Sequence, residues 1–312
     1  MELVWVEKYR PKEIEDIVGN EAIVDVFKIF SKEESMPHLI LTGAPGIGKT
    51  TLIGCLISRI FKDDQKDPKD PKDQKKKDCV LEMNASDERG VEVVRTKIKA
   101  FLQKKLDHLR FLILDESDAM TPAAQQSMRR LLEKHTDARF IFICNDISKI
   151  ADTIQSRCAI LRFSPLSPTD TKRIIKRIAQ AEGVTVDEPS ADLIAETAEG
   201  DARQAINLLQ TLASISKTVK IELTRKMSHI PPTSAVEQML SKDRTLPQAI
   251  ASLDALFEEG YSCEDVAKLV FKVGKDRSDL FLLEEASKLL LRISHSPAPI
   301  HFYALLHQYL SF

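Results

Sequence analysis

The chain has 312 residues, of which 43% are hydrophobic and 29% are charged, and its formal net charge is −2 at pH 7. This length allows two or three domains with sizeable cores, and the near-neutral charge excludes a chain that is basic throughout, so any nucleic-acid contact must come from a local basic face. The five cysteines are scattered without a CxxC pair, the N-terminus is charged and no apolar run is long enough for a membrane span, so we expect an intracellular, soluble protein without disulfides or structural zinc.

The first half of the chain alternates apolar strand candidates with helical patterns. The strand candidates are 38–43, 79–84, 110–116, 139–145 and 159–164, and helical periodicity covers 91–106 and 121–135. Strands that alternate with helices predict a parallel, doubly wound α/β sheet. Thr121 can cap the helix that follows it, and Pro122 suits the first helical position.

Beyond this region the strand signal fades and the pattern is helical. We expect an α/β domain over 1–164, a small helical lid domain over 165–230 and an all-helical domain over 231–312. The segment 62–78 holds lysines and aspartates in nearly equal number and no apolar residue. It predicts a disordered surface loop, with a nuclear-import or DNA-binding tract as the alternative.

The stretch GAPGIGKTT, residues 43–51, matches the phosphate-binding pattern G-x-x-x-x-G-K-[ST] between a predicted strand and a predicted helix. The glycines let backbone N–H groups close around phosphates, and the helix N-terminus favours an anion. Lys49 is predicted to reach the β- and γ-phosphates and Thr50 to ligate Mg²⁺. The predicted nucleotide-binding residues of this loop are Gly43, Ala44, Pro45, Gly46, Ile47, Gly48, Lys49, Thr50 and Thr51.

The stretch FLILDE, residues 111–116, brings two carboxylates to the end of another strand. Asp115 can hold Mg²⁺ directly or through water, and Glu116 can polarise an attacking water, as a hydrolase requires. The alternative for Glu116 is a surface carboxylate at a strand end. Asn145 ends a further strand, where its amide can orient water or touch the γ-phosphate, although asparagine is common at strand ends.

Two arginines are further candidates. Arg203 lies in the first turn of a helix that Asp201 can cap, and because cations are disfavoured there, an external anion is one explanation and a solvated surface arginine the other. Arg157 precedes the strand AILRF, and the residues alone favour an interface or surface salt bridge for it.

These motifs together resemble the AAA+ ATPases, and specifically the small subunits of replication factor C, the sliding-clamp loader. The resemblance is carried by WVEKYRPKEIEDIVGNE near the N-terminus, the loop at 43–51, NASDERGVEVVRTKIKAF at 84–101, LDESDAM, IQSRCAILRF and EGDARQAINLLQ. Two residues depart from the family pattern: Thr153 stands where relatives usually carry proline, and Ser117 replaces an alanine.

The resemblance implies a hetero-pentameric ring of clamp-loader subunits that binds ATP with Mg²⁺ between neighbours and places a sliding clamp on primer–template DNA. It implies that Val6, Arg10 and Val18 line the adenine site, that Asn145 and Arg203 are the two sensors, and that Arg157 acts in trans on the neighbour's γ-phosphate. It also implies a nuclear location in a eukaryote, or a cytoplasmic one otherwise, and a helical collar at the C-terminus.

Basic residues near the helix at 91–106 are candidates for DNA contact by phosphate neutralisation: Arg89, Arg95, Lys97 and Lys99. An ordinary solvated helix face is the alternative for each of them. Two other functions stay open at this point, namely another AAA+ DNA motor such as a branch-migration helicase, and a scaffold subunit that binds ATP without hydrolysing it.

Overall fold

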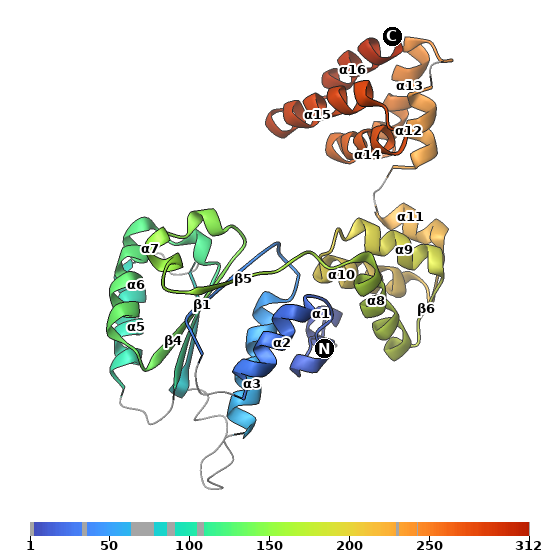
Figure 1. The fold of residues 1–312 in the computed structure, drawn as a ribbon. Coiled ribbons are helices and arrows are strands. Elements are labelled where there is room, and N and C mark those ends of the chain that lie inside the picture. Colours follow the sequence, from blue (N-terminus) through green and yellow to red (C-terminus); the bar gives the residue numbers. More distant parts are fainter. Residues whose placement is uncertain are drawn as a thin grey trace. The chain divides into compact units, whose positions relative to one another are not determined.

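The computed structural model describes residues 3–32, 36–63, 78–85, 91–104, 109–228, 231–241 and 243–311, with the backbone alone at 62–63 and 91–95. The chain divides into two compact units, residues 1–218 and 219–312, which are taken in turn (Figure 1). The finer domain boundaries expected after residues 164 and 230 remain predictions. The predicted loop at 62–78 lies mostly outside the described residues, although helix α3 continues to Asp63 and the Asp78 carboxylate accepts a hydrogen bond from Lys104 Nζ at 3.0 Å.

Five parallel strands form the sheet of the first unit, as the alternating pattern predicts. They are β1 (Leu39–Thr42), β2 (Val80–Asn84), β3 (Arg110–Asp115), β4 (Ala138–Cys144) and β5 (Ala159–Arg162). Their order is β2-β3-β4-β1-β5, and every pairing is parallel. The carboxyl ends of all five strands therefore meet at one edge of the sheet, which is where open α/β sheets bind their ligands.

Both faces of this sheet are covered by helices. Helices α2 (Glu21–Phe30) and α3 (Lys49–Asp63) lie on one face, and α5 (Val91–Gln103) and α6 (Pro122–Lys134) lie on the other (Figure 1). Successive strand residues point to opposite faces, so alternate positions supply two separate apolar layers. The layer toward α5 and α6 includes Ile40, Leu112, Leu114, Phe140 and Phe142. The layer toward α2 and α3 includes Leu39, Leu41, Ile113, Ile141 and Ile143.

Short elements and caps complete the first unit. The backbone N–H of Ala124 donates to Thr121 Oγ1 at 3.3 Å, and Pro122 occupies the first position of α6, which confirms the predicted helix start. The short helices are α1 (Trp5–Lys8), η1 (Ile14–Asp16), η2 (Ser117–Ala119), η3 (Ile147–Lys149) and α7 (Asp152–Gln155).

Three longer helices follow β5 in the same unit. They are α8 (Pro168–Glu182), α9 (Glu188–Thr197) and α10 (Ala202–Ile215). The short strand β6 (Thr185–Val186) lies between α8 and α9, and β7 (Thr218–Val219) follows α10 at the boundary between the two units. We call α8, α9 and α10 the lid helices. The side-chain amide of Asn20 binds the backbone of Ser164 in the connection from β5 to α8. Its Nδ2 donates to the Ser164 carbonyl at 3.0 Å, and its Oδ1 accepts from the Ser164 N–H at 2.8 Å.

The second unit is helical, as predicted for the C-terminal region. It contains α11 (Ile221–Ser228), α12 (Thr233–Met239), α13 (Leu246–Glu258), α14 (Cys263–Asp276), α15 (Leu280–His295) and α16 (Ile300–Leu310). One apolar core includes Val236, Leu253, Val270, Leu289 and Phe302. Among the helices that the structure describes, none combines the length and the apolarity that a membrane crossing requires.

Candidate nucleotide-binding site

The loop between β1 and α3 lies at the carboxyl edge of the sheet, and Gly43 and Gly46 show why it needs glycine. Gly43 has φ +150° and Gly46 has φ +68°, values that disfavour other residues. A Cβ on Gly43 would lie 2.6 Å from the carbonyl oxygen of Phe163, and a Cβ on Gly46 would lie 1.8 Å from Asp201 Oδ1. The loop is therefore closely packed against both the end of β5 and the start of α10.

Lys49 points back into this loop from the first turn of α3. Its side chain is buried, with 7% of the residue exposed, and its Nζ donates to the carbonyl oxygens of Gly43 and Ala44 at 2.6 and 2.7 Å. Burial lowers the pKa of the Lys49 ammonium, an effect that the Asp115 carboxylate opposes and the Arg203 guanidinium reinforces. Both of these carbonyl acceptors are uncharged. An anion bound at the loop would therefore be stabilised by the buried positive charge of Lys49.

Thr50 and Asp115, the two residues predicted to bind Mg²⁺, meet beside the loop. Thr50 Oγ1 donates to Asp115 Oδ2 at 2.9 Å, and Asp115 Oδ1 accepts from the backbone N–H of Glu116 at 2.8 Å. A hydroxyl and a carboxylate are oxygen ligands that suit Mg²⁺. Mg²⁺ is commonly bound by one or two protein oxygens and takes its other ligands from phosphate and water, which a pair of this kind allows.

Glu116 lies in the turn that leaves β3. Its side chain is exposed, and its backbone has the left-handed conformation, with φ 51° and ψ 40°, which few residues other than glycine adopt. Backbone conformations of this kind cluster at functional sites, because the surrounding structure must compensate for their cost. The left-handed turn carries Glu116 past the end of the strand while Asp115 stays beside Thr50.

Asn145 follows β4, the strand between β1 and β3. Its side-chain Oδ1 accepts a hydrogen bond from Lys49 Nζ at 3.0 Å, so the amide and the ammonium predicted to face the same phosphate are in contact. The structure thus brings together four of the predicted site residues, Lys49, Thr50, Asp115 and Asn145. We call this group the phosphate end of the site.

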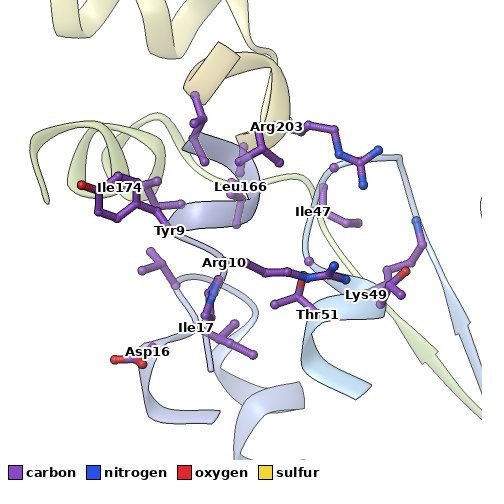
Figure 2. Close-up of a pocket in the computed structure, with 18 of the residues that line it drawn as sticks. Tyr9, Arg10, Asp16, Ile17, Ile47, Lys49, Thr51, Leu166, Ile174 and Arg203 are labelled. Atoms are coloured by element: carbon purple, nitrogen blue, oxygen red, sulfur yellow. The ribbon is translucent and has the colours of Figure 1, made fainter. Parts of the chain in front are cut away.

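A pocket with an apolar wall continues from the loop toward the N-terminal segment and the lid helices (Figure 2). Its walls include two of the residues implied for the adenine site, Val6 and Val18, and four that the sequence did not single out: Ile17, Leu166, Ile174 and Ile206. We call these six residues the apolar end of the site. Three of the additional residues lie on or beside the lid helices, and nothing in their own spacing distinguishes them from ordinary core residues.

Arg10 and Arg203 line the same pocket from opposite sides. Arg10 Nε donates to Thr51 Oγ1 at 3.3 Å, and Figure 2 shows its side chain reaching toward Thr51. Arg203 lies in the first turn of α10, where Asp201 Oδ1 accepts from its backbone N–H at 2.7 Å, so the predicted cap is confirmed. The backbone N–H of Ala202 donates to the Gly46 carbonyl at 3.1 Å, which fixes the start of α10 against the loop.

The N-terminal segment is held to the lid helices by polar contacts. Glu182, at the end of α8, accepts from Lys8 Nζ at 2.6 Å and from the Tyr9 hydroxyl at 2.7 Å, and Gln210 Oε1 accepts from the Trp5 N–H at 3.0 Å. The hydrogen bond from Lys8, followed by that from Tyr9, lowers the pKa of the Glu182 carboxyl. These contacts close the apolar end between two segments that are far apart in sequence.

Comparisons with known proteins identify the family of this chain. A family profile described as DNA polymerase III, delta subunit, matches residues 19–167. Replication factor C subunit 4 of Encephalitozoon cuniculi is 37% identical over 306 residues, which cover 96% of this chain and 95% of that protein. The proteins of the same name from Schizosaccharomyces pombe and Saccharomyces cerevisiae are each 41% identical and cover 88% of this chain and 79% and 84% of their own lengths. The chain belongs to the replication factor C small-subunit family.

Solved structures agree on the fold. The Thermotoga maritima RuvB Holliday junction branch migration motor superimposes with a TM-score of 0.57 at 18% identity, over 78% of this chain and 85% of that one. At this identity the likeness shows the fold alone. The predicted fold class is confirmed: an AAA+ P-loop domain with a parallel sheet, followed by helical regions.

Arg157, which the replication factor C resemblance assigns to a neighbouring subunit's ATP, does not line this chain's pocket. Its Nη2 donates to Glu133 Oε1 on α6 at 2.6 Å, and its Nη1 donates to the Thr153 carbonyl at 2.8 Å. About a third of the side chain, 34%, is exposed. The salt bridge that the residues alone favoured is therefore present, and it leaves Arg157 at the surface. Thr153, the replacement for a family proline, supplies this carbonyl through its backbone.

The structure describes Ser117 and some of the basic residues predicted to contact DNA. Ser117, the replacement for a family alanine, is fully buried and its hydroxyl donates to the Leu114 carbonyl at 2.6 Å, so the replacement is accommodated. Lys97 and Lys99 are exposed on α5. Arg89 and the side chain of Arg95 lie outside the described residues, so the DNA-contacting face remains a prediction.

Proposed function

We propose that this chain is an ATP-binding and ATP-hydrolysing small subunit of a sliding-clamp loader. In this proposal it assembles with other loader subunits in a hetero-pentamer, opens the clamp and places it on primer–template DNA during replication and repair. The observation that carries the proposal is the phosphate end, where Lys49 contacts Asn145 and Thr50 contacts Asp115 at the edge of a P-loop sheet. The relatives named replication factor C subunit 4 support the assignment to a clamp loader.

The phosphate end can bind the triphosphate of ATP. Lys49 supplies a buried positive charge, and the N-terminus of α3 adds backbone N–H groups that favour an anion. Thr50 and Asp115 would hold Mg²⁺, which when bound neutralises charge on the phosphate oxygens. Arg203 approaches the same space from α10 and contributes a second cation.

Hydrolysis requires a base that activates water and a group that stabilises charge on the transferred phosphoryl group. Glu116 is the proposed base, because it directly follows the proposed metal-binding carboxylate and its side chain is exposed. Asn145 is proposed to orient water or the γ-phosphate through its side-chain amide, whose oxygen accepts a hydrogen bond from Lys49. Arg157 does not line the nucleotide pocket of this chain, and it is proposed to act on the ATP of the adjoining subunit.

The apolar end suits a flat, largely apolar base. Val6, Ile17 and Leu166 belong to three separate segments of the first unit and line one pocket beside the loop. Arg10 joins this wall to the loop through Thr51. ATP with Mg²⁺ is therefore the proposed ligand, and a nuclear location follows from the proposed role if the organism is a eukaryote.

A reconstituted loader tests the proposal. The full chain is assembled with its partner subunits, and ATP turnover is measured with and without the clamp and primed DNA. Turnover that is stimulated by both and reduced by Lys49→Ala in this chain is expected. Binding of ATP without any turnover at this site would instead identify a scaffold subunit, and turnover stimulated by branched DNA but not by the clamp would identify another kind of AAA+ motor.

A further inference from the structure

Asp118 lies two residues beyond Glu116, in the turn η2, and its carboxylate reaches the end of the next strand. Asp118 Oδ2 accepts hydrogen bonds from the backbone N–H of Asn145 at 3.2 Å and from that of Asp146 at 3.3 Å. The residue is half-buried. One carboxylate oxygen therefore joins the turn that carries the proposed base to the loop that carries the proposed sensor amide.

These two hydrogen bonds lie where the sheet's own hydrogen bonding has ended. The pairing of β3 with β4 ends at Leu114 and Phe142, and the pairing of β1 with β4 ends at Thr42 and Cys144. Asn145 and Asp146 come after both ends. The Asp118 carboxylate thus replaces the missing sheet partner for both N–H groups, and a charged acceptor makes such bonds about twice as strong as a neutral one.

The turn η2 does not itself need this carboxylate. The Ala119 N–H donates to the Glu116 carbonyl at 2.9 Å, and the Met120 N–H donates to the Ser117 carbonyl at 3.2 Å. The Ser117 hydroxyl adds its bond to Leu114. The backbone and Ser117 close the turn, so the Asp118 side chain remains available to act across to the β4 loop.

We propose that Asp118 is a positioning residue for ATP hydrolysis, which holds Asn145 in the place where its side chain meets Lys49. The proposal rests on the function proposed above for this site. Asn145 Oδ1 lies 3.0 Å from Lys49 Nζ. Asn145 therefore links Asp118 to Lys49 by hydrogen bonds. Asp118 acts through Asn145 and is not itself assigned any contact with the nucleotide.

The first test measures turnover at this chain's site in the full assembled loader, with the partner subunits' own sites inactivated. Asp118→Ala is expected to lower kcat about tenfold while the Kd for ATP changes by less than about threefold, because the loop and the apolar end are unchanged. Asp118→Asn is expected to stay within about threefold of the wild-type kcat, because an amide oxygen can accept the same two bonds. Added to Asn145→Ala, the Asp118→Ala change is expected to lower kcat no further, since residues that act through one another are not additive.

The matched control is Asp146→Ala, which removes the same charge from the loop after β4, the loop that the Asp118 carboxylate contacts. The Asp146 carboxylate accepts from the N–H and hydroxyl of Ser148 at 2.9 and 2.7 Å. Its loss should leave kcat within about twofold. Three results would each overturn the proposal: equal losses of kcat in Asp118→Ala and Asp146→Ala, an equal loss in Asp118→Asn and Asp118→Ala, or full additivity with Asn145→Ala.

A second measurement does not depend on hydrolysis. Amide hydrogen exchange of Asn145 and Asp146 in the full chain is expected to be at least about tenfold faster in Asp118→Ala than in the wild type, because both N–H groups lose their acceptor. Unchanged exchange overturns the positioning role. If the wild-type site shows no turnover, the proposed function fails, and the exchange rates still decide whether Asp118 holds this loop.

Discussion

The phosphate end and the apolar end of the site are built in different ways. At the phosphate end, side chains from the carboxyl ends of neighbouring strands and from α3 make direct polar contacts, such as that between Lys49 and Asn145. At the apolar end, Val6 comes from the N-terminal segment and Ile174 from a lid helix. The two segments are joined by contacts such as that of the half-exposed Lys8 with Glu182. One end belongs to a rigid sheet, whereas the other exists only while two distant segments stay together.

This difference predicts where the site is robust and where it can be adjusted. Contacts within the sheet edge are supported by the whole core, so they are preorganised for a ligand. Exposed ion pairs contribute little stability, typically about 0–1 kcal/mol, so the apolar end can open at low cost. Substitutions at the phosphate end should therefore have larger effects than substitutions that loosen the apolar end.

Lys49→Ala should have the largest effect on ATP binding. It removes the buried cation nearest the loop, and we expect the Kd for ATP to rise at least about 100-fold, as measured by calorimetry. Burial lowers the pKa of Lys49, so losing this charge offsets part of the cost of the three hydrogen bonds that the substitution removes. Lys28→Ala, which removes an exposed lysine paired with Asp25, is the matched control and should leave the Kd unchanged. An unchanged Kd in Lys49→Ala would contradict the assigned phosphate site.

Glu116→Gln should separate binding from hydrolysis. The change keeps the size of the side chain and the Asp115 contact with Thr50 but removes the base, so single-turnover hydrolysis at this site should fall about 10²–10⁴-fold with the Kd for ATP within about threefold. Wild-type turnover in this variant would show that another group activates the water. Asp146→Ala, nearby and exposed, controls for a general loss of negative charge.

Arg157→Ala should act on a different subunit's site. Because Arg157 lies outside this chain's pocket, its loss should leave this chain's ATP affinity unchanged and slow hydrolysis at the adjoining subunit at least about tenfold. The measurement is turnover of a mixed assembly in which only that adjoining site is competent. Arg129→Ala is the control, because Arg129 also pairs with Glu133 on the same surface. If the isolated Arg157→Ala chain bound ATP more weakly while turnover at the adjoining subunit stayed intact, the arginine would serve the nucleotide site of this chain.

Glu182→Ala should have the smallest effect and tests the apolar end directly. It removes the acceptor shared by Lys8 and Tyr9, so the Kd for ATP should rise about two- to fivefold, in line with one exposed pair and one hydrogen bond. Glu188→Ala, which removes an exposed partner of Lys176 on another lid helix, should leave the Kd unchanged. An effect of Glu182→Ala as large as that of Lys49→Ala would show that the two ends are equally preorganised.

Much of the fold follows from local pattern. The strand candidates at 38–43 and 110–116 became β1 and β3, and Thr121 begins α6, because strand alternation and helix caps are short-range signals. The loop at 43–51 could be located for the same reason, since its glycines and Lys49 are contiguous in sequence. The order β2-β3-β4-β1-β5 was not predicted, because it depends on how distant strands pair.

The sequence by itself determined the residue types of the site: a glycine loop with Lys49 and Thr50, a carboxylate pair at Asp115 and Glu116, and Asn145 at a strand end. Only the tertiary structure decided which of them touch, that Leu166 and Ile206 complete the apolar end, and that Arg157 pairs with Glu133. Asp118 shows the same limit, since no spacing rule predicts that its carboxylate bonds Asn145, 27 residues away. The physical reason is that chemistry resides in single side chains and short motifs, whereas contact is set by the packing of elements far apart along the chain.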